Sequence, residues 1–83
     1  METNPNDVIT SATNTNILVA IARSGSNKNK IAKAAGVPLT TFSRKINGHG
    51  DFSLRELGNI ADALGLTLDQ ILPMELISHK VAV

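Results

Sequence analysis

Two short helical patterns meet at the tetrapeptide Ala35-Gly36-Val37-Pro38, and this turn constrains the fold more than any other segment. Gly36 suits the left-handed conformation that ends a helix, because glycine has no Cβ atom to clash there. Pro38 pre-sets the backbone angle φ for the first turn of the next helix and loses no hydrogen bond there. Val37 can fill the gap between the neighbouring helices. The segment therefore predicts two short consecutive helices joined by a tight turn.

Capping residues mark where two later helices begin. Ser53 is followed three residues later by Glu56, and Thr67 is followed three residues later by Gln70. Both pairs fit the capping box, in which two side chains satisfy backbone N–H groups at the start of a helix. We expect a fourth helix that starts at Ser53 and ends at Gly65, and a short fifth helix after Thr67.

The spacing of apolar residues places three helices before these two. They cover residues 14–24, residues 27 or 28 to 36 with Asn27 as the N-cap, and residues 39–47. The predicted inward-facing residues of the five helices are Ile17, Leu18, Ile21, Ala22, Ile31, Ala32, Ala35, Leu39, Phe42, Ile46, Leu54, Leu57, Ile60, Ala61, Leu64, Leu68, Ile71 and Leu72.

These patterns predict an all-α fold, a compact bundle of five short helices. Residues 1–12 are polar and contain Pro5, so we expect a flexible N-terminal arm that can fray into the first helix. Residues 13–73 form the predicted helical domain. Residues 74–83 form a short C-terminal tail that is apolar enough to serve dimerisation or to bind a partner.

Charge is separated along the chain. Residues 8–50 contain no carboxylate and six cations, which are Arg23, Lys28, Lys30, Lys33, Arg44 and Lys45. All seven carboxylates lie outside this segment, so the net charge of +1 conceals the separation. Positive charge without local neutralisation, on two helices joined by a tight turn, is what a polyphosphate backbone attracts. Double-stranded DNA is therefore the first partner to consider.

The third predicted helix has an apolar side and a polar side. The apolar side contains Leu39, Phe42 and Ile46. The polar side contains Thr40, Ser43, Arg44 and Asn47. Thr, Ser and Asn form helices less readily than the Glu, Lys and Gln of ordinary solvated faces, which favours a contact role. In a major groove, Arg44 would bind guanine O6 and N7, and Thr40 and Ser43 would bond to base edges. The alternative is that this stripe is ordinary protein surface.

Six residues near the same surface are predicted phosphate contacts, namely Lys28, Lys30, Thr41, Lys45, Asn47 and His49. Lys28 occupies the first turn of the second helix, where a cation is unfavourable for an isolated helix although free N–H groups attract an anion. A bound phosphate would resolve this conflict. The alternative for each lysine is a solvated side chain that points away from any partner.

These residues resemble the lambda-repressor-like helix-turn-helix domain, also called the Cro/repressor type, of phage and bacterial regulators. The resemblance covers residues 26–72 and rests on Ile31-Ala32, Ala35-Gly36-Val37, Phe42-Ser43, Ile46, Gly48, Ser53-Leu54, Ile60-Ala61-Asp62-Ala63-Leu64-Gly65-Leu66 and Leu68-Asp69-Gln70-Ile71-Leu72. It implies five helices, of which the second and third form the helix-turn-helix. The third helix would enter the major groove, usually within a dimer on a two-fold operator.

By position, the resemblance implies a phosphate contact for Lys28, an approach to the DNA backbone for Asn47, and base contacts for Leu39, Thr40, Ser43 and Arg44. Members of the family often have Gln at the positions of Lys28 and Leu39. Leu39 also falls on the apolar side of its helix, so it either packs inward or contacts a thymine methyl group.

Composition argues against several other classes of protein. A chain of 83 residues without cysteine forms one small domain that lacks disulfides and thiolate chemistry. His49 and His79 lie 30 residues apart, and no nucleophile lies near a base, so we expect no metal, cofactor, small-molecule ligand or enzymatic activity. The longest strictly apolar run, residues 17–22, is too short for a membrane span, and we expect a cytoplasmic protein. Two Phe and no Tyr or Trp argue against single-stranded nucleic acid and RNA.

The expected function is that of a sequence-specific transcriptional regulator of double-stranded DNA, a phage-type repressor similar to Cro. It would act as a homodimer whose two third helices reach half-sites about 34 Å apart. The alternative is an interaction protein with the same fold, such as an antitoxin that binds its toxin through the arm or tail and binds DNA only secondarily.

Overall fold

Five helices make up the part of the chain that the computed structural model describes, which is the backbone of residues 5–73 and the side chains of residues 8–73. In chain order they are α1 Pro5–Ser24, α2 Lys28–Ala35, α3 Leu39–Ile46, α4 Leu54–Ala63 and α5 Leu68–Ile71. No strand occurs within residues 5–73. The prediction of an all-α fold with five helices is confirmed.

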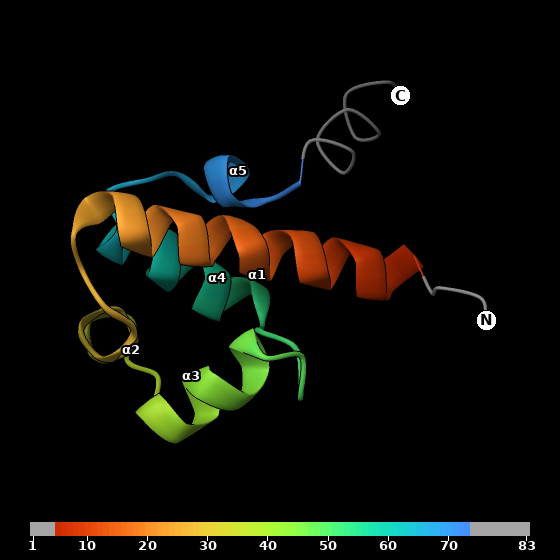
Figure 1. Cartoon of the computed structure of the whole chain (residues 1–83), viewed down its shortest axis with the longest axis horizontal. Helices are drawn as coiled ribbons and strands as arrows, with labels where there is room; N and C mark the ends of the chain where they lie inside the picture. Colours follow the sequence, from red (N-terminus) through yellow and green to blue (C-terminus); the bar gives the residue numbers. More distant parts are fainter. Residues whose placement is uncertain (1–4, 74–83) are drawn as a thin grey trace.

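The helix α1 crosses the molecule from one side to the other (Figure 1). The helix α5 lies on one side of α1, whereas α2 and α3 lie on the other side. Closest packing occurs between α2 and α4, and between α2 and α3. The helix α3 therefore lies at the edge of the molecule that is far from α5.

The first helix begins much earlier than predicted. It starts at Pro5, not near residue 14, so residues 5–12 do not form the predicted flexible arm. Proline is favoured in the first turn of a helix. The buried face of α1 then includes two polar residues, Thr13 and Asn14, with exposed fractions of 4% and 6%. Thr13 satisfies its hydroxyl by donating to the carbonyl of Ile9 at 2.8 Å. These polar residues interrupt the apolar period, which is why periodicity missed the first half of the helix.

The predicted N-caps of α2 and α4 and the predicted turn after α2 are confirmed. The side chain of Asn27 accepts the N–H of Lys30 at 2.9 Å, which caps the start of α2. Gly36 ends α2 with φ of 73°, and the N–H of Val37 donates to the carbonyl of Ala32 at 2.9 Å. The capping box of α4 is complete, because Ser53 Oγ accepts the N–H of Glu56 and Glu56 Oε1 accepts the N–H of Ser53.

The core joins all five helices. Its fully buried large side chains are Phe42, Ile17, Ile60 and Ile71, which come from α3, α1, α4 and α5. The helix α2 contributes Ile31, Ala32 and Ala35, as predicted. Val37 is buried between α2 and α3, as predicted from the turn.

Four predicted core residues lie on the surface instead. They are Leu18 and Ala22 of α1, Leu39 of α3 and Leu54 of α4. In α1 the buried stripe runs through residues 13, 14, 17 and 21, which turns Leu18 and Ala22 outward. Leu39 and Leu54 are the first residues of their helices. Helical spacing gives the direction of a side chain, but it does not say whether a neighbouring helix extends far enough to cover the first turn.

Asparagine side chains connect the ends of three helices to their neighbours. Asn14 of α1 donates to the carbonyl of Lys45 in α3 at 3.1 Å, and Asn16 of α1 donates to the carbonyl of Ile71 in α5 at 3.0 Å. Asn59 of α4 donates to the carbonyl of Ala35, the last residue of α2, at 3.5 Å. The last carbonyls of a helix have no partner within it, and these bonds give each of the three carbonyls a partner from another helix.

Among residues 5–73, none of the helices has both the length and the apolar character that crossing a membrane requires. Residues 74–83, predicted as a dimerisation or partner-binding tail, lie outside the described residues, as do residues 1–4 of the predicted arm.

Candidate nucleic-acid interface

The outer face of α3 presents most of the predicted base-contacting residues to solvent. Thr40 and Arg44 are exposed, and Asn47 is exposed directly after the helix. Ser43 is half-buried, so only part of its side chain is accessible. On the inner face Phe42 and Ile46 are buried, with exposed fractions of 0% and 4%. The helix is therefore anchored through one side, and its hydroxyl, guanidinium and amide groups face outward.

Leu39 belongs to this outer surface. Its side chain is 44% exposed, so the alternative in which it packs inward is wrong. The first turn of α3 lies at the end of the helix that is farther from α1 (Figure 1), and α1 does not cover it. Leu39 thus places an apolar group next to Thr40 at the start of the helix.

The first turn of α2 provides two exposed cations. Lys28 and Lys30 are both exposed, and neither forms an ion pair among the side chains of residues 8–73. Asn27 caps one of the N–H groups of this turn through its bond to Lys30. Two lysines therefore stand at a helix start, where the helix dipole already has its positive end.

Lys45 occupies a different environment from the other predicted phosphate contacts. Its Nζ lies 2.8 Å from Oε1 of Glu56, the first-turn carboxylate of α4, and both side chains are only 24% exposed. The Nζ also lies 6.0 Å from the centre of the Phe52 ring. The ammonium group is thus directed toward α4 and is neutralised there. The structure does not group Lys45 with Lys28 and Lys30.

This ion pair changes the acid–base behaviour of Glu56. The hydrogen bond from Lys45 lowers the pKa of the Glu56 carboxyl most, and the N–H of Ser53 lowers the pKa further. Desolvation opposes both effects by raising the pKa. Residue spacing did not predict this pair, because the two residues are 11 positions apart and lie on different helices.

The loop after α3 continues the polar outer surface. His49 and Gly48 are exposed, and Thr41 on α3 is half-buried. The N–H of His49 donates to the carbonyl of Arg44 at 2.8 Å, which holds the loop against the end of the helix. His49 and Asn47 therefore lie at one end of the α3 surface, and Leu39 and Thr40 lie at the other.

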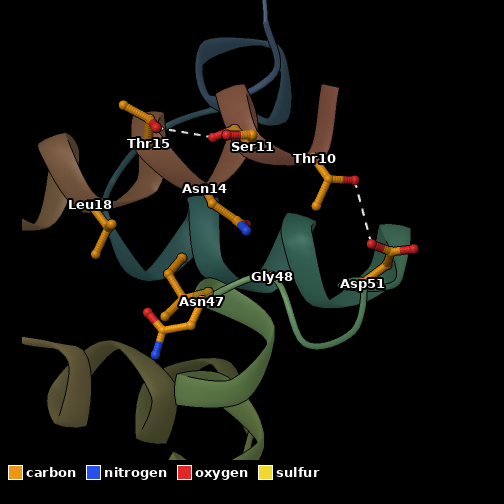
Figure 2. A pocket seen from close by; sticks show the side chains of 9 residues that line it. Thr10, Ser11, Asn14, Thr15, Leu18, Asn47, Gly48 and Asp51 are labelled. Carbon is orange, nitrogen blue, oxygen red and sulfur yellow. Dashed lines mark hydrogen bonds between the residues drawn. The ribbon is translucent and has the colours of Figure 1, made fainter. Parts of the chain in front are cut away.

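A polar cavity of about 450 Å³ lies between α1 and the end of α3 (Figure 2). Its lining includes Thr10, Asn14, Asn47 and Asp51, and Thr10 donates to Asp51 Oδ1 at 3.4 Å. Asn14, whose buried side chain lines this cavity, was not among the predicted site residues. The sequence did contain a sign of this position, because asparagine is a poor helix former and it lies three residues before the core residue Ile17, on the same side of the helix.

Carboxylates are sparse at the start of α2 and on α3. Those described are Asp51, Glu56, Asp62 and Asp69. Glu56 is paired with Lys45, and Asp51 accepts the Thr10 hydroxyl. Asp69 lines a separate cavity between α1 and α5. The surface formed by the start of α2 and the outer face of α3 therefore combines hydrogen-bonding side chains with three cations that no carboxylate of residues 8–73 pairs, which are Lys28, Lys30 and Arg44.

Within residues 8–73, no three His, Asp or Glu side chains come together in a way that would hold a metal ion. The surface formed by the start of α2 and the outer face of α3 offers hydrogen-bonding groups, positive charge and the apolar side chain of Leu39. Comparison of the chain with protein-family models, curated proteins and solved structures gave no match.

Proposed function

We propose that this chain is a sequence-specific regulator of double-stranded DNA in which α2 and α3 act as a helix-turn-helix. The observation that carries the proposal is the outer face of α3, where Thr40 and Arg44 are exposed while Phe42 and Ile46 anchor the opposite face in the core. A helix held by one side can enter the major groove with its other side, because that groove is wide enough for an α-helix.

The exposed groups of α3 match the chemistry of base edges. The guanidinium of Arg44 can donate two hydrogen bonds to O6 and N7 of guanine, which distinguishes guanine from the other bases. Thr40 and Ser43 can bond to base edges, and the exposed methyl groups of Leu39 can contact a thymine methyl group. Leu39, Thr40, Ser43 and Arg44 are therefore the proposed base-contacting residues.

The flanking residues would hold the DNA backbone. Lys28 and Lys30 at the start of α2 supply positive charge next to free backbone N–H groups. Thr41, Asn47 and His49 supply hydrogen-bonding groups around the ends of α3. Lys45 is not included, because its ammonium is bound to Glu56.

The resemblance to lambda-repressor-like domains supports a more specific role. We propose a homodimer that binds a two-fold operator and represses transcription in the bacterial cytoplasm by excluding RNA polymerase, as a small phage repressor would. Two copies of α3 would then reach half-sites about 34 Å apart. The alternative of an antitoxin depends largely on residues 74–83, which lie outside the described residues.

Selection of bound duplexes from a random library tests the proposal directly. The purified protein is expected to enrich a two-fold symmetric consensus, and the spacing of the two halves should correspond to one helical turn of DNA. The double variant T40A/R44A should enrich no consensus, whereas R23A should enrich the wild-type consensus because Arg23 lies beside α5. Failure of the wild-type protein to enrich any sequence, even at low salt, would refute the proposal.

A further inference from the structure

We propose that Lys45 is a positioning residue that sets the orientation of α3, and that Asn14 and Glu56 hold it in place from two neighbouring helices. This inference rests on the proposed function, because orientation matters only if α3 reads DNA. It assigns a role in specificity to three residues that do not touch the DNA.

The first support acts on the backbone of Lys45. Its carbonyl accepts a hydrogen bond of 3.1 Å from Nδ2 of Asn14, and Asn14 is only 6% exposed on α1. The same carbonyl accepts the N–H of Gly48 at 3.0 Å. The last turn of α3 is thereby tied to the middle of α1 by a buried side chain.

The second support acts on the side chain of Lys45. Its Nζ lies 2.8 Å from Oε1 of Glu56, and the same oxygen accepts the N–H of Ser53 at 2.8 Å. The capping box of α4 therefore holds the Glu56 carboxylate in place independently of Lys45. The stem of Lys45 passes close to Gly50, since a Cβ atom built there would lie 3.5 Å from Cγ of Lys45. The ammonium end of the side chain is therefore held by a carboxylate that is itself fixed.

These two supports add directional contacts to the apolar contacts that the core makes with α3. Phe42 and Ile46 hold α3 by apolar contacts, which depend little on direction. Hydrogen bonds depend on both distance and angle, so the bonds of Lys45 oppose rotation of α3 about its axis. Arg44 is the adjacent residue and the main proposed base contact. A small rotation of this eight-residue helix would displace its guanidinium from the guanine edge.

Lys45 in contact with phosphate is the competing explanation, and E56Q separates the two. The side-chain carbonyl of the introduced glutamine can still accept the N–H of Ser53, so the capping box is kept, whereas the charge attraction to Lys45 is lost and its hydrogen bond is weakened. If Lys45 positions α3, the ratio of specific to non-specific affinity should fall about two- to fivefold, with an unchanged salt dependence. If Lys45 instead binds phosphate, E56Q frees it, affinity rises for all duplexes, and the ratio is unchanged.

Removal of the ammonium itself provides the second test. K45M should lower the affinity ratio at least as much as E56Q, and the double variant should lose no more than K45M, because the two residues act as one unit. K45R, which keeps the positive charge, should have the same ratio of specific to non-specific affinity as the wild-type protein. D62N is the matched control, since it removes one carboxylate from an exposed position of α4 and should leave the ratio unchanged.

The ratio of specific to non-specific affinity also shows whether Lys45 only stabilises the fold. Partial unfolding lowers specific and non-specific binding together, so the ratio does not change, and circular dichroism gives the folded fraction of each variant. If K45M keeps the ratio and lowers the salt slope by about one, Lys45 is a phosphate contact and the inference is wrong. If the wild-type protein enriches a consensus but E56Q keeps the wild-type affinity ratio, this inference is wrong and the proposed function stands. A wild-type protein without sequence preference overturns the proposed function and this inference with it.

Discussion

The ring of Phe42, in the middle of α3, packs against the ring of Phe52, with the ring centres 5.4 Å apart and the ring planes at 55°. These are the two aromatic residues of the chain. Phe42 is fully buried, and Phe52 is half-buried in the loop before α4. Tilted aromatic pairs add stabilisation beyond the apolar area that they bury. The pair therefore fastens the inner face of α3 to the segment that leads into α4, and the outer face stays accessible.

Replacement of Phe42 should have a large effect on stability. We expect F42A to lower the free energy of unfolding by about 3–5 kcal/mol, because it leaves a cavity in the core and removes the aromatic pair. Urea denaturation followed by circular dichroism measures this change. L54A is the control, since Leu54 is 67% exposed and its loss should cost less than about 0.5 kcal/mol. A near-wild-type melting temperature for F42A would contradict the packing of α3.

Two glycines should respond to alanine in opposite directions. Gly36 has φ of 73°, a conformation that strains other residues, so G36A should destabilise the protein by about 1–2 kcal/mol. Gly58 lies within α4, and a Cβ atom added there meets nothing within 4 Å. G58A should therefore stabilise the protein by about 0.5–1 kcal/mol. Thermal melts of both variants measure these changes. Stabilisation by G36A would contradict the geometry of the turn after α2, and destabilisation by G58A would contradict the open position within α4.

Arg44 should carry specificity at one base pair. R44A should weaken binding to the selected duplex by about 1–3 kcal/mol and relax the preference at a single position of the consensus. Fluorescence anisotropy with duplexes substituted at each position measures both effects. R23A removes the same charge from an exposed residue beside α5 and should not change the preference. Equal losses of R44A on every duplex would place Arg44 on the DNA backbone.

Lys28 should contribute affinity without specificity. K28A should weaken specific and non-specific binding alike and reduce the slope of log K against log salt by about one unit. The same change should slightly raise folding stability, because a cation at the start of α2 opposes the helix dipole. Titrations at several salt concentrations and a thermal melt give the two results. An unchanged salt slope would remove Lys28 from the proposed interface.

Acid should weaken the fold partly through Glu56. The pKa of this carboxyl lies below its usual value near 4.5, chiefly because of the Lys45 hydrogen bond. A lowered pKa contributes stability that is complete above the pKa of the unfolded chain and is lost as pH falls through the folded value. The free energy of unfolding should therefore fall as the pH is lowered from neutral through the usual pKa near 4.5 and below it, and it should fall less in E56Q and K45M. Urea midpoints across this range measure the difference. Parallel curves for E56Q and the wild-type protein would contradict the role of this carboxyl.

The sequence predicted the ends of helices where a capping residue lies within a few positions of the helix end. Asn27, Gly36 and Ser53 cap or end their helices as expected, since each acts on backbone groups within a few residues. The start of α1 was not predictable from apolar spacing. Thr13 and Asn14 lie on its buried face, and their polar groups are satisfied by carbonyls that periodicity does not reveal.

The sequence predicted which kinds of side chain the candidate interface exposes, but it did not predict which of its charged side chains form an ion pair. Helical spacing identified the outward stripe of Thr40 and Arg44, which the structure exposes. The same spacing assigned Leu39 to the apolar side, although its side chain is exposed at the first turn of α3. Lysine is a residue type that commonly contacts phosphate, but the ammonium of Lys45 is bound by Glu56 from a different helix at 2.8 Å.

Local sequence sets where α2 to α5 begin and end and which side of α3 is polar, because caps and helical period act over a few neighbouring residues. Packing among helices sets the rest: the burial of Asn14, the exposure of Leu39 and the capture of Lys45 by Glu56. Each of these depends on groups that are distant along the chain and come within contact distance only when the helices assemble. A charge's availability to a partner is therefore a property of the folded surface, since an opposite charge from another helix can neutralise it first.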